Sequence, residues 1–141
     1  MDEDLIKFYK ERKKNISAMI KDKELRKKSL DWMLYTEKYN FTYNFSWMGR
    51  PIIKYPNDMI VQQELIYQLR PDLIIETGIA HGGSLVLSAS ILALLDYSDA
   101  LHAGEMLDPR NPKRKVVGVD IDIRQHNREA LDIHPMRNRM E

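Results

Sequence analysis

The stretch Leu73-Ile74-Ile75-Glu76-Thr77-Gly78-Ile79-Ala80-His81-Gly82-Gly83-Ser84 is the part of this chain that indicates its fold most directly. An apolar run ends in a carboxylate and is followed by a glycine-rich turn and a serine that can open a helix. A strand, loop and helix in this order place backbone N–H groups and a helix N-terminus beside one acidic side chain. Such a pocket suits a ligand with an anionic group at one end and a cationic or polar group at the other, as in a nucleotide-type cofactor.

The segments around this stretch predict an α/β fold. The expected elements, in chain order, are a helix over residues 58–69, a strand over 73–75, a helix over 84–95, a connection over 96–114, a strand over 115–120 and a helix over 127–134. Asp58 and Asn127 are candidate N-caps for the first and last of these helices. Residues 73–75 are a short continuous apolar run, which is typical of a strand buried on both faces, and residues 115–120 are expected to form a second buried strand. The alternation of strands and helices implies parallel strands joined by right-handed crossovers.

The N-terminal part of the chain differs in composition from the rest. Residues 2–40 are highly charged, contain no Gly or Pro and predict helix, whereas residues 41–57 are rich in aromatic side chains and predict an irregular loop. We therefore expect a helical and aromatic-loop cap over residues 1–57 and the first half of a cofactor-binding domain over residues 58–141. The helical segment is either a solvated amphipathic cap or a basic arm that touches nucleic acid. The aromatic loop either lines a substrate pocket or closes one end of the core.

Composition restricts the classes of function. The chain has 141 residues, of which 43% are hydrophobic and 30% are charged, which is the balance of a globular protein. Its net charge of +1 gives no electrostatic reason to expect a nucleic-acid or acidic-lipid partner. The absence of cysteine excludes disulfides and thiolate chemistry and fits a reducing compartment. Because no secretory signal and no apolar run of about 20 residues is evident, we expect a cytoplasmic protein without a membrane span.

Two strands are too few to cover the apolar helix expected over residues 84–95. We therefore expect the fold to be incomplete, with the missing strands in a longer protein or, less simply, in another chain. On its own, this chain would expose both edges of its sheet and one side of that helix. Instability or self-association, including a homo-oligomer, is the expected consequence.

The glycine-rich turn carries the candidate cofactor site. Gly78 allows a positive φ where the strand passes into the loop, and Gly82 and Gly83 lack Cβ atoms where a ligand would approach the backbone. Ser84 can cap the following helix or hydrogen-bond a carboxylate of the ligand. Glu76 lies at the carboxyl end of its strand, where ligands bind in open α/β sheets, and its charge suits an ammonium or sulfonium group.

Two acidic residues follow the second strand. Asp120 occupies the position that commonly binds two ribose hydroxyls, and Asp122 shares its face if the extended backbone continues. The spacing argues against a dinucleotide enzyme, because Asp120 lies 42 positions after Gly78 rather than about 20. A Walker loop is excluded because no Gly-Lys-Ser/Thr sequence follows the turn. The alternative is a structural role, in which Glu76 caps a loop and the glycines only relieve crowding.

Three segments of the chain have the pattern of a known family. They are residues 47–52 (WMGRPI) with Pro56-Asn57-Asp58 close behind, residues 71–84 (PDLIIETGIAHGGS) and residues 116–128 (VVGVDIDIRQHNR). Over about residues 45–138 the chain resembles the family of cephalosporin hydroxylases and rhamnosyl O-methyltransferases, a branch of the class I S-adenosylmethionine-dependent methyltransferases. The resemblance implies the N-terminal part of a Rossmann-like fold, preceded by a helical cap.

The resemblance also implies roles for single residues. Glu76 would lie beside the methionine amino group, Ser84 would hold the methionine carboxylate, and Asp120 would bind the ribose. Gly78, Ala80 and Gly82 would form the loop under the cofactor. Together with the residues argued from the pattern alone, the candidate cofactor-binding set is Glu76, Gly78, Ala80, Gly82, Gly83, Ser84, Asp120 and Asp122.

The reaction that the resemblance implies is methyl transfer from S-adenosylmethionine to a hydroxyl group. The acceptor would be a saccharide, a glycolipid or another small hydroxylated molecule. The family is also associated with Mg²⁺ held by carboxylates near the acceptor, at positions that would lie past Glu141. We therefore assign no metal ligand and no catalytic residue in this chain. The alternatives are a non-catalytic remnant or interaction module of the same fold, a hydroxylase-named relative and a nicotinamide-binding domain.

Overall fold

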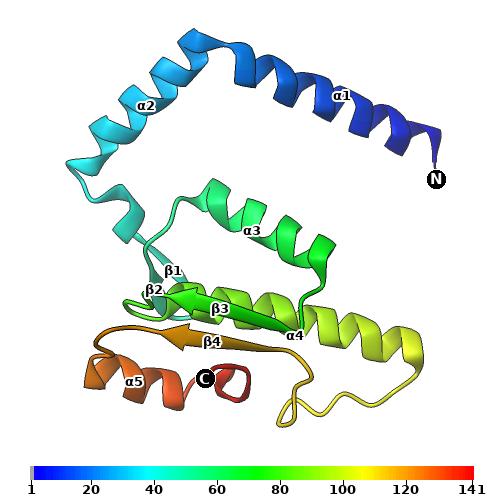
Figure 1. Ribbon diagram of the computed structural model, residues 1–141, viewed down its shortest axis with the longest axis vertical. Helices are drawn as coiled ribbons and strands as arrows, with labels where there is room; N and C mark the ends of the chain where they lie inside the picture. Colours follow the sequence, from blue (N-terminus) through cyan, green and yellow to red (C-terminus); the bar gives the residue numbers. More distant parts are fainter. Residues whose placement is uncertain (1) are drawn as a thin grey trace. The chain divides into compact units, whose positions relative to one another are not determined.

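The computed structural model describes residues 2–141, and the chain divides into two compact units, residues 1–41 and residues 42–141 (Figure 1). The boundary predicted from the sequence lies after residue 57 instead. The difference concerns the aromatic segment, whose strands contact a helix that follows them in the chain. The first unit therefore holds the charged helical segment without the aromatic segment.

Two helices make up most of the first unit. α1 spans Glu3–Lys21 and α2 spans Lys23–Glu37, so most of residues 2–40 is helical, as predicted. The two helices are separate because the backbone of Asp22 is extended and its carboxylate accepts a hydrogen bond from the Leu25 N–H at 2.9 Å. Neither helix contains a buried residue, and apolar side chains such as Phe8 and Leu34 are exposed.

The aromatic segment forms a β-hairpin rather than the predicted irregular loop. β1 (Phe45–Trp47) pairs antiparallel with β2 (Arg50–Ile52), after a short 3₁₀ helix at Phe41–Tyr43. Met48 and Gly49 both have positive φ, which is the backbone of a two-residue type I′ turn. The prediction was wrong because the common signal for this turn is Asn-Gly or Asp-Gly, and here methionine takes the first position.

The first helix of the second unit, α3, spans Pro56–Leu69 and begins two residues before the predicted start. Tyr55 is its N-cap, and Pro56 occupies the first helical position, where a missing N–H costs little. The prediction that Asp58 is the N-cap is therefore wrong. Asp58 lies inside the first turn, where its negative charge favours the helix dipole.

The sheet of the second unit contains a parallel pair of strands, as predicted. β3 spans Leu73–Thr77 and β4 spans Lys115–Val119, and Glu76 lies opposite Gly118 in the register. The carboxyl ends of the two strands therefore lie side by side. The loop that follows β3 and the segment that follows β4 therefore begin at the same end of the sheet.

Residues 140–141 pair with the other edge of β4. Met140 forms a parallel bridge with Val116, and the Glu141 N–H donates to the Val116 carbonyl at 2.9 Å. The Gly118 N–H in turn donates to the Glu141 carbonyl at 2.7 Å. β4 is thus the middle strand of a small sheet, and β3 lies at its edge within the described residues.

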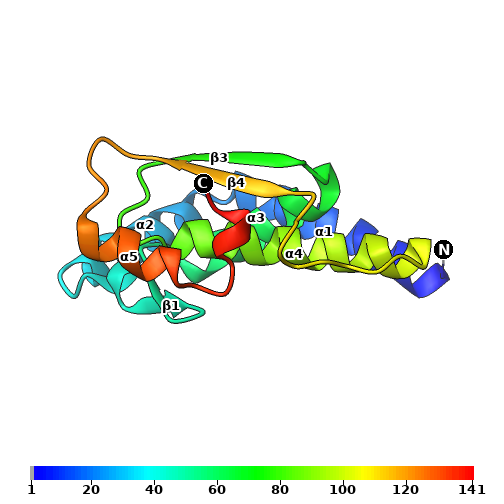
Figure 2. The same cartoon turned by 90° about the horizontal axis from the view of Figure 1, so that it is seen from below.

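In the second unit, helices cover only one face of this sheet. α4 (Gly83–Ala103) and α5 (Gln125–Asp132) lie on the same side of the two strands (Figure 2). On the opposite face, the side chains of Ile75 and Val119 are 65% and 52% exposed. The prediction that the first strand is buried on both faces is therefore wrong for the part of the chain described, and the second strand is only partly buried, because the helices that cover the sheet pack on one side only.

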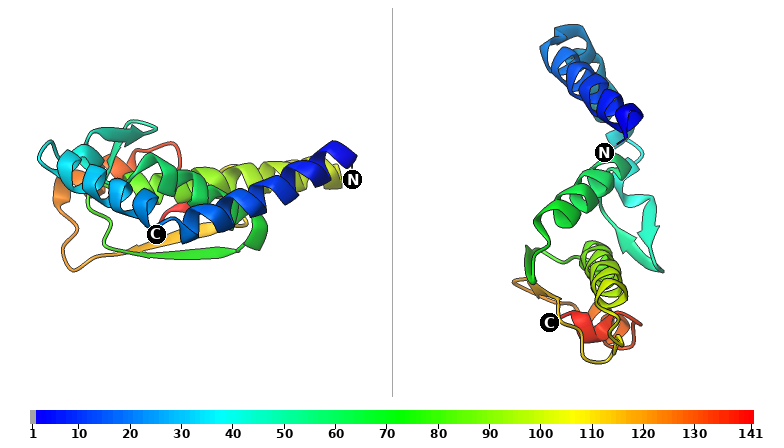
Figure 3. Two further views of the ribbon diagram at one scale, coloured as in Figure 1. Left: turned by 90° about the horizontal axis from the view of Figure 1, so that it is seen from above. Right: turned by 90° about the vertical axis from the view of Figure 1, so that its right-hand side faces the viewer.

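α4 is the central helix of the second unit. It continues well past Leu95, its predicted end, so the connection to β4 is limited to residues 104–114. The hairpin, α3 and β4 pack around it (Figure 3), and Val86 and Leu92 are completely buried. By length and mean hydropathy α4 could cross a membrane, but 61% of its most apolar window is buried in the fold, which is typical of a core helix.

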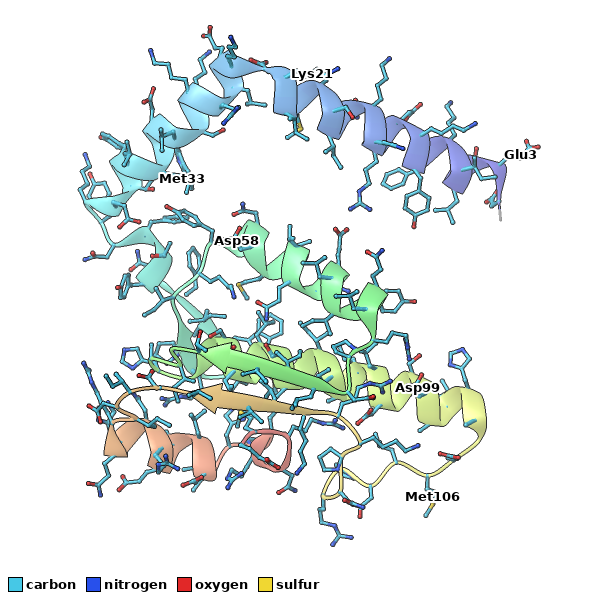
Figure 4. All side chains as sticks on the ribbon, in the orientation of Figure 1. Glu3, Lys21, Met33, Asp58, Asp99 and Met106 are labelled. Atoms are coloured by element: carbon cyan, nitrogen blue, oxygen red, sulfur yellow. The ribbon has the colours of Figure 1, made fainter. Side chains whose placement is uncertain are left out.

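A buried cluster of ion pairs joins α4 to the start of two neighbouring strands. The two oxygens of Asp96 accept hydrogen bonds from the guanidinium groups of Arg114 and Arg139, each at 2.6 Å. Arg114 directly precedes β4, and Arg139 directly precedes residues 140–141. Asp99, labelled in Figure 4, pairs with Arg114 at 2.9 Å. Burial alone would raise the pKa of Asp96, but hydrogen bonds from Arg139 and Arg114 lower it on balance.

Candidate functional site

Glu76 contacts the first turn of α4. It is the last but one residue of β3, and its carboxylate accepts a hydrogen bond from the Ser84 hydroxyl. Burial raises the pKa of Glu76, whereas the Ser84 hydrogen bond and the charge of Lys54 act in the opposite direction. Gly82, not Ser84, is the N-cap of α4, so the prediction that Ser84 caps this helix is wrong. The Ser84 hydroxyl binds the carboxylate of its own chain instead.

The loop between β3 and α4 has an unusual backbone. Gly78, Ala80 and Gly82 all have positive φ, and alanine pays a steric cost for this conformation. The Gly78 N–H donates to the Val119 carbonyl at 2.8 Å, which ties the start of the loop to β4. A Cβ on Gly78 would meet no atom within 4 Å, so the space beside this residue is open. This is the one glycine of the loop that leaves room for a ligand.

Gly82 and Gly83 make room for the chain itself and not for a ligand. A Cβ on Gly82 would lie 2.7 Å from the side chain of Leu131 on α5. A Cβ on Gly83 would overlap the carbonyl oxygen of Pro51 and lie 2.7 Å from Ile52 in the hairpin. The prediction that these two glycines let a ligand approach the backbone is therefore wrong, because the chain's own atoms occupy the space beside them.

Asp120 links the end of β4 to the loop after β3. Its carboxylate accepts hydrogen bonds from the Ile79 N–H at 2.8 Å and from the Asp122 N–H at 3.3 Å. These backbone hydrogen bonds, that from Ile79 first, lower the pKa of Asp120 and favour its charged form. Asp120 directly follows β4, and two residues before it Gly118 lies opposite Glu76 in the register. The two acids stand at neighbouring strand ends, on either side of the glycine-rich loop.

Asp122 does not share this arrangement. β4 ends at Val119, and the backbone bends at Ile121, so the extended conformation that the prediction required does not continue to Asp122. Its side chain is exposed, and its backbone N–H supports Asp120. We therefore assign Asp122 a local structural contact rather than a place beside Glu76.

Two residues that the sequence analysis did not assign to the site hold the loop in place. Arg50 of the hairpin donates to the His81 carbonyl from Nε at 2.9 Å and from Nη2 at 2.7 Å. Asn127 donates to the Ala80 carbonyl at 2.9 Å and accepts from Arg50 at 3.0 Å. Asn127 is only 3% exposed and lies inside α5, whose N-cap is Arg124, so its prediction as an N-cap is wrong. The available signal was that both residues lie within the segments of the family pattern.

A separate cavity lies between the sheet and α5. It has a volume of about 130 Å³, and its lining includes Leu85, Gly118, Leu131 and Met140 but neither Glu76 nor Asp120. It is therefore distinct from the region above the glycine-rich loop. Among residues 2–141, no group of three or more His, Asp or Glu side chains could hold a metal ion.

The sequence of this chain is similar to a known protein family and to a curated relative. The sequence model of the family described as "Rhamnosyl O-methyltransferase/CmcI" matches residues 39–141. A rhamnosyl O-methyltransferase of Mycobacterium leprae (strain TN) is 34% identical over 83 residues, which is 58% of this chain and 30% of that relative. The matched part thus spans less than a third of the relative's length. No solved structure matches the chain.

Proposed function

Because the chain belongs to the rhamnosyl O-methyltransferase/CmcI family, we propose that it contributes the donor-binding part of an O-methyltransferase that uses S-adenosylmethionine. The observation that carries the proposal is the pair of acids, Glu76 and Asp120, at neighbouring strand ends around one glycine-rich loop. In open α/β sheets, ligands bind outside the carboxyl ends of the strands. On this proposal, the fold is the first part of the class I methyltransferase fold.

The residues present fit this cofactor. The open side of Gly78 provides space directly beside the loop backbone. Asp120 is held in its charged form by backbone N–H groups, and a carboxylate has further lone pairs for two ribose hydroxyls. Glu76 supplies a negative charge for the ammonium group of the methionine part. The ends of the ligand would thus be recognised by two carboxylates that the chain already positions.

The chain's own contribution to the reaction is positioning. The donor, when bound, would supply an electrophilic methyl group: the acceptor oxygen would form a bond to the methyl carbon in line with the breaking C–S bond, S-adenosylhomocysteine would leave, and the hydroxyl proton would pass to a base or to water. Glu76 and Asp120 would fix the donor at its amino-acid and ribose ends, so that the methyl group points in one direction. Holding reactants in this way lowers the entropic part of the barrier. The acceptor that we propose is a saccharide hydroxyl, in keeping with the rhamnosyl group named for the Mycobacterium leprae relative.

Titration with S-adenosylhomocysteine tests the proposal. We expect saturable binding to the full chain by calorimetry, weakened at least about tenfold, or roughly 1.4 kcal/mol, by Glu76→Gln and by Asp120→Asn. Both substitutions keep an oxygen that accepts the hydrogen bonds of Ser84 and Ile79, and Asp120→Asn gives up only the longer contact with the Asp122 N–H, so they remove charge with little change in structure. Asp108→Asn is the matched control, because Asp108 is an exposed carboxylate in the connection 104–114.

Three results would contradict the proposal. A folded wild-type chain that does not bind S-adenosylhomocysteine would favour the non-catalytic module, and binding of NAD instead would favour a nicotinamide enzyme. Equal affinity of the wild type and both site variants would mean that the ligand binds elsewhere.

Binding is also expected to depend on pH through Glu76. Burial raises the pKa of this carboxyl, so it takes up a proton at a higher pH than an ordinary glutamate. The affinity for S-adenosylhomocysteine should fall as the pH decreases through this raised pKa, because the ligand's ammonium stays charged while Glu76 becomes neutral. Calorimetry over a pH series should show this loss in the wild type and a much flatter profile in Glu76→Gln.

The contribution of Glu76 to the stability of the fold changes with pH in the opposite direction to its contribution to ligand binding. A carboxyl whose pKa is raised on folding stabilises the folded state below its unfolded pKa, and this contribution is lost as the pH rises through the folded pKa. Protonation of Glu76 therefore does not itself unfold the chain. A melting curve recorded at each pH separates loss of binding from loss of structure.

A further inference from the structure

A chain of polar side chains connects Lys54 to the helix that carries Ser84. The Lys54 ammonium donates to the Gln62 side-chain oxygen at 2.7 Å, and the Gln62 amide donates to the Ser88 hydroxyl at 2.9 Å. Ser88 is completely buried, and Gln62 is half-buried on α3. The ammonium group of Lys54 is therefore held by Gln62 of α3, whose side chain is in turn anchored to α4 through Ser88.

These contacts place Lys54 near Glu76. Ser84 and Ser88 are four residues apart on α4, so they lie on one face of the helix, one turn apart. Glu76 binds the first of these serines, and Lys54 reaches the second through Gln62. The positive charge of Lys54 also acts electrostatically on Glu76. The cation Lys54 and the anion Glu76 are thus connected to neighbouring turns of the same face of α4, Lys54 through Gln62 and Glu76 directly.

Ser84 has no second proton to give. A hydroxyl carries a single hydrogen, and in the structure Ser84 donates it to Glu76. From the family resemblance, Ser84 was predicted to bind the carboxylate of the methionine part of S-adenosylmethionine. An ammonium has three N–H donors, of which Gln62 accepts one, so Lys54 can donate to a further oxygen.

The amino-acid end of S-adenosylmethionine is a zwitterion, with an ammonium and a carboxylate on the same carbon atom. Glu76 can bind only the first of these groups. We infer that Lys54 is a second donor-binding residue, which pairs with the carboxylate of the amino-acid end while Glu76 pairs with its ammonium. This inference rests on the proposed function, because it assigns a further contact to the same ligand.

The experiment compares two ligands that differ in the carboxylate alone. S-adenosylmethionine carries both groups of the zwitterion, whereas its decarboxylated form keeps the ammonium and lacks the carboxylate. We expect Lys54→Met, which keeps the length of the side chain, to weaken S-adenosylmethionine about tenfold and to change the affinity for the decarboxylated form less than twofold. Calorimetry at a pH above the raised pKa of Glu76 keeps that carboxyl charged in every sample.

The remaining variants serve as controls. Lys54→Arg should restore most of the affinity, because it returns the positive charge. Lys113→Met should change neither affinity, because Lys113 is an exposed residue of the connection 104–114. Lys54→Gln replaces Lys54→Met if the methionine variant does not fold. Glu76→Gln should weaken both ligands, because both carry the ammonium group.

The outcomes separate this inference from the proposed function. If the wild type binds S-adenosylmethionine and Glu76→Gln weakens it while Lys54→Met does not, the proposed function stands and the role of Lys54 is overturned. Equal weakening of both ligands by Lys54→Met would also overturn it, since Lys54 would then act only through Glu76 or the fold. If the wild type binds neither ligand, both proposals fail together.

Discussion

Replacing Asp96 with alanine is expected to lower the free energy of unfolding by about 3–5 kcal/mol, because it leaves the buried Arg139 without its anion and leaves Arg114 with only the half-exposed Asp99. Arg114 and Arg139 are 8% and 4% exposed, and the Asp96 carboxylate pairs with both at 2.6 Å. Their guanidinium groups cannot lose a proton at ordinary pH, so the cost cannot be avoided by neutralisation. Urea unfolding followed by circular dichroism measures the change.

A matched substitution distinguishes the buried pair from ion pairs in general. Asp99 contacts Arg114 at 2.9 Å, but its side chain is 41% exposed, so Asp99→Ala is expected to cost about 1 kcal/mol or less because solvent screens the pair. Equal losses for the two variants would contradict the argument from burial. The cluster also sets the acid limb of the stability curve. Because the pKa of Asp96 is lowered on folding, its contribution is present above its unfolded pKa and is lost as the pH falls through the folded pKa.

Replacing Gly83 with alanine is expected to cost about 3 kcal/mol, the upper part of the range for overpacking, because the new methyl group meets backbone. The Cβ would overlap the Pro51 carbonyl oxygen and press on Ile52, so the hairpin and α4 would have to separate. In an unobstructed helix the same change would stabilise by about 0.5–1 kcal/mol, so the sign of the effect tests the contact. Urea unfolding gives the stability.

The same substitution should weaken ligand binding, because the hairpin carries Arg50, which holds the His81 carbonyl in the loop. Gly104→Ala is the control. Gly104 also has a positive φ, but a Cβ there would meet no atom within 4 Å. It should therefore lose some stability from backbone strain alone and leave the affinity for S-adenosylhomocysteine unchanged. A stabilised or unchanged Gly83→Ala would disprove the close approach of α4 to the hairpin.

The N-termini of α3 and α5 were predicted incorrectly from the sequence. Asp58 and Asn127 are both residue types that favour N-caps, yet each lies inside a helix. At α3 the proline two residues earlier sets the start, since its φ already suits the first helical position. In α5 the side chain of Asn127 is used for a contact with Ala80, which is distant in the sequence. A capping preference describes the local backbone and carries no information about such a distant partner.

The parts of this protein that were readable in its residue pattern are those that depend on near neighbours. The apolar run, the turn with Gly78 and the helix after it follow from periodicity and backbone freedom. The parallel pairing of β3 with β4 joins distant segments and was predicted instead from the alternation of strands and helices. These features also carried the family resemblance and the choice of Glu76 and Asp120.

Folding alone settled which distant side chains meet. The contacts of Arg50 with Asn127, of Asp96 with Arg139 and of Lys54 with the serine face of α4 join segments far apart in the chain. Packing likewise assigned the empty sides of Gly82 and Gly83 to Leu131 and the hairpin. Such contacts depend on how helices and strands fill space around α4, and no local spacing of residues encodes that arrangement.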